Sequence, residues 1–277
     1  MMKIISLITA LLFINAAAFC QTEVKLFPDK LNVQPFTANA LEPRIGVLFH
    51  VNNNELRLDI GNSLDLVKIS PNKETNYSVG ADFFTYTLLR GEKDFHFPVD
   101  AVDYLFGLNA GYRKTTDKGE YGARFRLSHI SAHFVDGHFD FKNEIWRDNR
   151  NPRVYSREFL ELMPFYRIND LRVYAGLTYI FHIDPAYLGK YNFQAGFDYF
   201  LKNRISEYVT PFVAYDIKLV KIRSYSAENT INAGIKFGHP QGRGFSLYYS
   251  YYSGMSIHGE YFDYRKSYNA IGFNLDL

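Results

Sequence analysis

The chain has 277 residues and a formal net charge of +2, and 17% of its residues are aromatic, with 22 Tyr and 25 Phe but one Trp. A charge this close to zero argues against nucleic acid as a partner. Beyond the N-terminus no apolar run approaches the ~20 residues that a membrane helix needs, so helical membrane spans are excluded.

The N-terminus has the layout of a secretory signal peptide. One early lysine precedes an apolar run over residues 4–19, and polar residues follow. Ala18 and Cys20 form a small-x-small cleavage site, which predicts removal of residues 1–20 and a mature chain that starts near Gln21. Cleavage there removes the only cysteine, so no disulfide and no thiol chemistry is expected. The alternative is a lipoprotein lipidated at Cys20, which its bulky preceding residue disfavours.

Residues 21–43 show no clear period. We expect them to form a periplasmic N-terminal segment that plugs or lines the mouth of the domain that follows, residues 44–277. No internal repeat, low-complexity tract or second domain is visible in that domain.

The rest of the chain alternates between apolar and polar residues with a period of two, which indicates β-strands. In LRVYAGLTYIFH (171–182) one face is apolar and the other is polar or glycine, with Ile180 as the exception. About twelve strands are predicted, near residues 44–52, 55–69, 77–90, 99–114, 120–135, 154–168, 171–183, 190–202, 207–222, 226–238, 243–254 and 266–277.

The connections between these strands favour an outer-membrane β-barrel over a soluble sandwich, which also alternates. Many strands exceed the 9–11 residues that cross a bilayer at a tilt. With a periplasmic N-terminus, every second connection is a short turn, such as TTDKG and HPQGR, whereas the others include DGHFDFKNEIWRDNRNP and GMSIHGEYFDYR. Short periplasmic turns and long outer loops are typical of barrels in bacterial outer membranes. We therefore predict an all-β, antiparallel transmembrane barrel of about twelve strands in a Gram-negative bacterium.

Six stretches together resemble a known family. They are LEPRIGV (41–47), VDYLFGLNAGYRK (102–114), ARFRLSHISAHFVD (123–136), SREFL (156–160), LRVYAGLTYIFHIDP (171–185) and SGMSIHGEYF (253–262). The chain resembles, from about Leu26 to its C-terminus, a bacterial outer-membrane barrel family known only as a domain of unknown function, number 1207. Members tend to have Ser-Ser between the histidines of H-x-S-x-H and Gly-Asp after them, where this chain has Ala132 and Val135. The resemblance implies a barrel in the outer membrane and no established activity.

The stretch RFRLSHISAHF (124–134) carries the main candidate chemistry. A metal site on His129 and His133 is excluded by spacing, because residues four apart on a strand have Cα atoms about 13 Å apart. His129 and Ser131 are two apart, about 7 Å between Cα atoms, so an imidazole can reach the hydroxyl. The chain has no HExxH, P-loop or dinucleotide motif.

Which face carries these residues depends on the phase of the strand. If the strand is regular, His129, Ser131 and His133 face outward near the extracellular rim, and Glu158 of the next strand shares that face. Glu158 would orient His129 and His129 would activate Ser131, with His133 as the alternative base. This arrangement is similar to that of outer-membrane phospholipases and lipid A deacylases, which carry an H-x-S pair on the barrel exterior.

The alternative is a β-bulge at Ser128–His129, which would turn the same residues into the lumen. Apolar Ile130 and Phe134 would then face lipid, and we favour this arrangement. The three side chains would join a lumen polar network that also comprises Asp103, Arg113, Arg124, Arg126, Arg172 and Asp198. A third possibility is that they are rim residues without a function. No role is predicted for five histidines at strand ends or in loops, His50, His96, His182, His239 and His258.

The leading functional hypothesis is a narrow pore or a surface or partner-binding barrel, and the alternative is a lipid acyl hydrolase that uses Ser131, His129 and Glu158. No cofactor or metal is expected, except calcium in the case of the hydrolase. The expected partners are outer-membrane lipid or lipopolysaccharide and, during insertion, the barrel-assembly machinery. Neither nucleic acid nor a soluble partner is expected.

Overall fold

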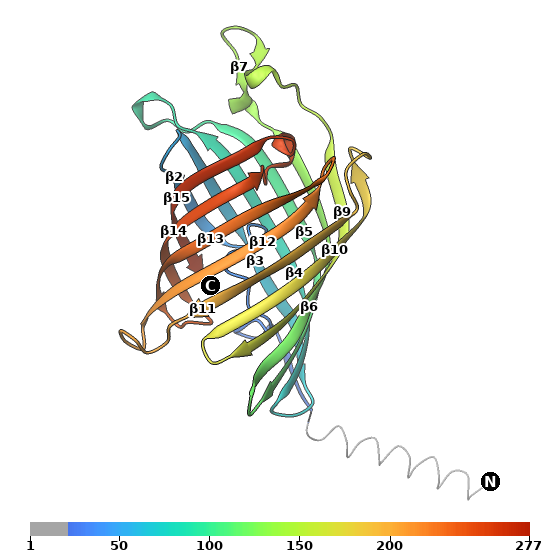
Figure 1. The fold of residues 1–277 in the computed structure, drawn as a ribbon, viewed down its shortest axis with the longest axis vertical. Coiled ribbons are helices and arrows are strands. Elements are labelled where there is room, and N and C mark those ends of the chain that lie inside the picture. The colour runs from blue at the N-terminus through green and yellow to red at the C-terminus, as the bar shows by residue number, and fades with distance from the viewer. Residues whose placement is uncertain (1–21) are drawn as a thin grey trace, which may run out of the picture.

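The computed structural model describes residues 22–277, which form one closed antiparallel β-barrel (Figure 1). Each barrel strand pairs with its neighbours along the chain, and the last strand pairs with the first, as predicted. The predicted signal peptide, residues 1–20, lies outside the described residues. Between residues 22 and 277 no helix is long and apolar enough to cross a membrane.

The twelve barrel strands confirm the fold class and follow the predicted ranges closely. They are β2 (Ile45–His50), β3 (Glu55–Ser70), β4 (Thr75–Arg90), β5 (Val99–Thr116), β6 (Gly119–Phe134), β9 (Tyr155–Ile168), β10 (Leu171–Asp184), β11 (Tyr191–Phe200), β12 (Val209–Lys221), β13 (Tyr225–Gly238), β14 (Gly244–Met255) and β15 (Arg265–Asp276). Three short strands lie outside this set. β1 (Glu23–Leu26) pairs with the end of β3, and β7 (Phe139–Asp140) pairs with β8 (Ile145–Trp146) in the longest loop.

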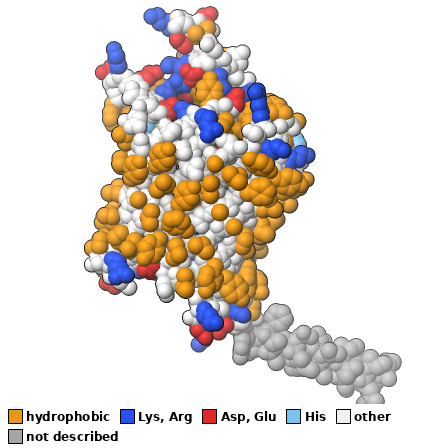
Figure 2. Space-filling model, viewed as in Figure 1, with side chains coloured by type: hydrophobic (Ala, Val, Ile, Leu, Met, Phe, Trp, Pro, Cys, Tyr) orange, Lys and Arg blue, Asp and Glu red, His pale blue; other side chains and the backbone are white. Residues whose placement is uncertain are grey.

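Side chains alternate across the barrel wall as the period-two pattern requires. Outward-facing leucines are well exposed, for example Leu127 at 43% and Leu162 at 49%, whereas their neighbours Arg126 and Glu161 are buried in the lumen. Figure 2 shows the resulting apolar surface along the wall, with charged side chains gathered at the two ends. Such an outward apolar band is typical of barrels that sit in lipid.

The N-terminal segment fills the half of the lumen at the end of the barrel that the sequence predicts to be periplasmic. After β1 the chain turns at Phe27, where φ is 47°, and enters the barrel. Phe36, Asn39 and Glu42 are almost fully buried there, and the guanidinium groups of Arg124 and Arg172 lie over the Phe36 ring, 4.8 and 4.6 Å from its centroid. Residues 31–43 therefore occupy the space that a pore would need.

A loop closes the opposite end of the lumen, which the sequence predicts to be extracellular. Residues 256–264, between β14 and β15, contain the 3-10 turn η4 (Gly259–Tyr261) and are mostly buried. Asp103 of β5 accepts a hydrogen bond from the Gly259 amide at 2.7 Å, and its other oxygen is 2.8 Å from Nδ1 of His258. We call residues 256–264 the cap, since they separate the lumen from the outer loops.

Candidate functional site

Strand β6 is regular, so the favoured bulge at Ser128–His129 is wrong. The pairing of β6 with β5 and with β9 runs without a register shift from one end to the other. Ser128, Ile130 and Ala132 are buried in the lumen, and His129, Ser131 and His133 lie on the exterior. They therefore do not join the lumen polar network.

The reason lies in what covers the lumen side of the strand. Ile130 is 4% exposed and belongs to an apolar cluster inside the barrel that includes Phe159, Ile180 and Phe262 of the cap. An apolar residue near the rim can thus face inward without contacting lipid. The apolar residues that suggested a bulge pack against a loop from the other end of the sequence.

On the exterior, a carboxylate and an imidazole meet. Glu158 of β9 lies directly opposite His129 of β6, and Oε1 of Glu158 is 2.6 Å from Nδ1 of His129. A carboxylate only accepts, so Nδ1 carries the proton and Nε2 is left as a free acceptor. The ring of Phe106, 4.9 Å away between centroids, packs against the imidazole from β5. The pair is therefore held in one tautomer and one orientation.

Ser131 lies one step nearer the extracellular rim on the same face. Its two cross-strand neighbours, Tyr104 of β5 and Ser156 of β9, also carry hydroxyl groups. Within residues 22–277 the Ser131 hydroxyl makes no hydrogen bond to either flanking histidine. His133, the alternative base, is exposed and contacts the ring of Tyr104 at 6.1 Å, but has no carboxylate to orient it.

A second histidine shares Glu158, and the sequence pattern missed it. The pairing of β10 with β9 shifts between Ile180 and His182, a β-bulge that leaves Ile180 inside and Phe181 and His182 outside. Nδ1 of His182 contacts Oε2 of Glu158. A bulge near the rim therefore exists, but on β10 and not on β6. In the sequence, the apolar Ile180 among polar residues of one face was the sign of this irregularity.

The structure places all six predicted network residues in the lumen, where they form separate groups. Arg124 donates to Glu42 at 2.5 and 2.7 Å, and Arg126 donates to Glu42 at 3.1 Å and lies 2.8 Å from Asp82. This cluster ties the N-terminal segment to the wall at mid-barrel. Burial of an ion pair needs such multiple partners to offset desolvation.

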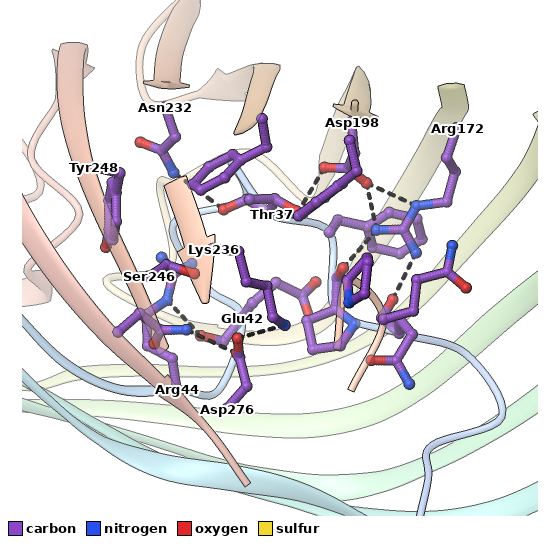
Figure 3. A pocket seen from close by; sticks show the side chains of 18 of the residues that line it. Thr37, Glu42, Arg44, Arg172, Asp198, Asn232, Lys236, Ser246, Tyr248 and Asp276 are labelled. Carbon is purple, nitrogen blue, oxygen red and sulfur yellow. Dashed lines mark hydrogen bonds and ion pairs between the residues drawn. The ribbon is translucent and has the colours of Figure 1, made fainter. Parts of the chain in front are cut away.

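The other predicted network residues hold three different parts of the molecule in place: the N-terminal segment, the cap and the periplasmic end of the wall. Arg172 donates to Asp198 at 2.7 Å and to the backbone oxygen of Gln34 at 2.8 Å. Asp103 holds the cap, and Arg113 pairs with Glu120 at 2.9 Å at the periplasmic end. A pocket of about 100 Å³ lies at the same end of the lumen. Figure 3 shows Arg172, Asp198 and Thr37 meeting on one side of this pocket, and Lys236 paired with Asp276 on another.

Sequence reasoning missed three participants. Glu42 carries the central ion-pair cluster, but it lies in an aperiodic segment that gives no contact information. His182 and His258 contact the site and the cap respectively, although no role was predicted for them. Among residues 22–277 no three metal-ligating side chains cluster closely enough to hold an ion.

The closed antiparallel wall, the outward apolar band and the filled lumen define an outer-membrane-type β-barrel. The family model described as "Protein of unknown function (DUF1207)" matches residues 101–276, and the chain belongs to that family. No curated protein matches the sequence.

Solved structures with the same fold are outer-membrane barrels. The Salmonella typhi outer membrane phospholipase, solved as a dimer with bound calcium, has a TM-score of 0.51 and 14% identity, with 89% of this chain and 94% of that chain covered. Outer membrane phospholipase A from Escherichia coli has a TM-score of 0.49 and 13% identity over 80% of each chain. The translocator domain of the autotransporter NalP from Neisseria meningitidis has a TM-score of 0.39 and 11% identity over 84% of each chain. At these identities the likeness concerns the fold alone.

Proposed function

We propose that the protein is an outer-membrane acyl-ester hydrolase with Ser131 as nucleophile, His129 as general base and Glu158 as the group that orients the base. The observation that carries the proposal is the 2.6 Å contact between Glu158 and His129 on the lipid-facing side of the wall, beside Ser131.

The chemistry follows from the tautomer. Nε2 of His129 removes the proton of the Ser131 hydroxyl as its oxygen bonds to the ester carbonyl carbon. The carbon–oxygen bond to the leaving alcohol then breaks, and the imidazolium returns the proton to that alcohol. Water releases the acid from the acyl-enzyme by the same steps. Glu158 stabilises the imidazolium in both halves of the reaction.

The oxyanion that forms on the carbonyl needs hydrogen-bond donors. The backbone amides of β6 are engaged in the sheet, so side chains must supply them. Tyr104 and Ser156 carry hydroxyl groups directly opposite Ser131 on the two neighbouring strands, and the Ser156 hydroxyl would turn to the oxyanion from its long hydrogen bond, 3.4 Å, to Oε1 of Glu158. Cβ atoms of such opposed residues are about 4.5–5.5 Å apart, within reach of one bound carbonyl oxygen.

The depth of Ser131 suits an ester in the outer leaflet. Leu127 and Leu160 form the next apolar layers on the lipid side, and Tyr104 lies at the level of Ser131. Tyrosines of barrel girdles sit at the boundary between head groups and acyl chains. The ester groups of membrane lipids lie at that boundary, so the proposed substrate is a lipid ester of the outer leaflet.

The pore, the leading hypothesis from the sequence, has less support because residues 31–43 fill one half of the lumen and the cap closes the other. Calcium, expected only with the hydrolase, does not fit the described site. Glu158 is the carboxylate beside Ser131, and it already binds two imidazoles, whereas Ca²⁺ takes six to eight oxygen ligands.

The test is ester hydrolysis by the full-length protein in mixed micelles of detergent and phospholipid, followed as release of free fatty acid. Wild type is expected to release acid, and Ser131→Ala to lower the rate by roughly 10³-fold or more. Ser253→Ala is the matched control, since Ser253 lies on the same outward register of β14, away from β6.

Equal rates for Ser131→Ala and wild type would refute the assignment, as would a wild type without activity on phospholipid and lipid A alike. Conductance across planar bilayers separates the pore, because a closed barrel is expected to pass no steady current. Steady channels from wild type would favour the pore instead.

A further inference from the structure

The pocket of about 100 Å³ shown in Figure 3 lies inside the barrel, at the end opposite the cap, and is separate from the proposed hydrolase site. Its lining includes Asp170 of the β9–β10 turn and Pro240 and Gln241 of the β13–β14 turn. Residues 34–37 and 42–44 of the N-terminal segment also line it. The pocket is therefore within reach of a solute at the end of the barrel that the sequence predicts to be periplasmic.

One wall of this pocket is aromatic. Phe200 of β11, Phe212 of β12 and Tyr248 of β14 line it from neighbouring parts of the barrel. The ring centroids of Phe200 and Phe212 are 5.2 Å apart, and those of Phe212 and Tyr248 are 6.3 Å apart. Sites for small molecules combine such an apolar wall with a few convergent polar groups. The wall favours a ligand that has one apolar face.

Three polar atoms of the lining are buried without a hydrogen-bond partner among residues 22–277. They are Oδ1 of Asn232, Oδ1 of Asn274 and the hydroxyl of Tyr248. Nδ2 of Asn232 donates to the backbone oxygen of Thr37 at 3.1 Å. Nδ2 of Asn274 donates to Asp276 at 2.8 Å. Because both of those partners only accept, each amide oxygen is left facing no donor. A buried acceptor without a donor costs free energy, which a ligand that carries hydroxyl groups would recover.

The charged groups around the pocket are already matched with one another. Four cations and four carboxylates line it, namely Arg44, Arg167, Arg172, Lys236, Glu42, Asp170, Asp198 and Asp276. Each of the eight takes part in an ion pair. The longest of these pairs, Arg44 with Asp59 and Arg167 with Glu120, measure 3.8 Å. An ionic ligand would have to compete with an existing pair, whereas a neutral ligand would not.

We propose that this pocket binds one neutral sugar ring. A hexopyranose has C–H groups on its flat face and hydroxyl groups around its edge, so it offers the apolar face and the donors that the pocket lacks. Its hydroxyl groups donate to Asn232 and Asn274, and its face packs against the wall formed by Phe212 and Tyr248. At ~10–15 Å³ for each water-sized site, the pocket holds roughly seven to ten waters, which is room for a single hexose.

The test is equilibrium dialysis of radiolabelled D-glucose, D-galactose and D-mannose against the full-length protein. The micelles are of lauryldimethylamine oxide, a detergent without a sugar head group, and a micelle-only sample is the blank. Wild type is expected to bind at least one of the three sugars saturably, with a Kd of about 1 mM or below. The corresponding uronate, which adds a carboxylate to the same ring, is expected to bind about tenfold more weakly.

Two substitutions locate the site. Asn232→Leu removes one acceptor and is expected to weaken binding about tenfold, and Tyr248→Phe, which removes a single oxygen from the lining, about fivefold. Their matched controls are Asn143→Leu and Tyr264→Phe in the outer loops, outside the pocket, and both are expected to bind as wild type does.

Three outcomes would overturn the proposal. They are no saturable binding of any of the three sugars up to about 10 mM, tighter binding of the uronate than of the neutral sugar, and unchanged binding in Tyr248→Phe together with Asn232→Leu. If Asn232→Leu fails to fold, because it also loses the bond to Thr37, Tyr248→Phe and the uronate still decide. None of these outcomes depends on ester hydrolysis, so this inference stands or falls separately from the proposed function.

Discussion

The barrel wall differs between its lower part and its outer rim along the same strands. In the lower part of β6 and β9, Leu127 and Leu160 face lipid and Arg126 faces the lumen, the usual arrangement of a transmembrane barrel. One residue pair closer to the rim, the polar and apolar faces of the two strands are exchanged. His129 and Glu158 face outward, while Ile130 and Phe159 are buried inside.

The inversion occurs without any change in strand geometry, because the β6–β9 register is continuous through it. What changes is the material on each side. Beside Arg126 the lumen is filled by ion pairs to Glu42 of the N-terminal segment, and beside Ile130 it is filled by an apolar cluster that includes the cap. The residue types on each face of a strand therefore depend on what packs against that face. Polar residues on the outward face near the rim are available for a reaction at the lipid boundary.

The lower part is expected to be the most sensitive to substitution. Glu42→Ala would leave Arg124 and Arg126 buried around the lost carboxylate, and breaking a buried ion pair in this way costs about 3–5 kcal/mol. The midpoint of thermal unfolding in micelles, followed by heat-dependent electrophoretic mobility, should fall accordingly. Glu74→Ala, in the exposed β3–β4 turn, is the control, and equal midpoints for the two variants would contradict the anchoring of the segment.

The sequence predicts the lower part better than the rim, for a physical reason. Period-two alternation predicts the strands and, wherever one face meets lipid, their phase. At Ile130 the alternation cannot distinguish an apolar residue that faces lipid from one that packs against Phe262, more than a hundred residues away. Glu42 was missed for a related reason, since an aperiodic segment shows no pattern that would reveal its partners across the lumen.

A pair of substitutions sharpens the contrast between the two apolar environments of β9. Phe159→Ala should cost about 3–4 kcal/mol, because the ring is buried at 5% exposure and its removal leaves a cavity. Leu162→Ala should cost about 1 kcal/mol or less, because detergent or lipid fills the space on the outward face. The comparison uses the same unfolding midpoint, and similar losses at the two positions would show that Phe159 is not packed in a closed lumen.

The rim is tested by a change that keeps shape and removes charge. Glu158→Gln retains an oxygen for Nδ1 of His129 but cannot stabilise the imidazolium, so the rate of fatty-acid release should fall roughly 10²-fold or more. The folded fraction and the unfolding midpoint should barely change. Glu207→Gln, in an exposed periplasmic turn, is the matched control.

Substitution of the two histidines that flank Ser131 tests which of them is the general base at the rim. His129→Ala should abolish ester release, whereas His133→Ala should leave most of it, because His133 has no carboxylate beside it among the described residues. The reverse result would make His133 the base and would remove Glu158 from the mechanism.

The smallest expected effect concerns the outer loops above the cap, through Asp263. Arg153 and Arg150 lie 2.7 and 3.0 Å from its Oδ1. Burial works to raise the pKa of Asp263, but these hydrogen bonds outweigh it and hold that pKa below its usual range. Because the pKa of Asp263 is lower in the folded state than in the unfolded state, its ionisation adds to the free energy of unfolding at neutral pH. This contribution is lost progressively as the pH falls below about 4.

Because Asp263 is partly exposed, solvent screening limits the effect to less than about 1 kcal/mol. The unfolding midpoint of wild type should exceed that of Asp263→Asn slightly at pH 7, and the difference should shrink as the pH is lowered to 3. Hydrogen exchange of the Tyr261 amide, which donates to the His258 oxygen within the cap, should follow the same trend. A difference that is undiminished at pH 3 would mean that Asp263 acts through packing rather than charge, and the loops above the cap would then owe their position to the apolar cluster beneath them.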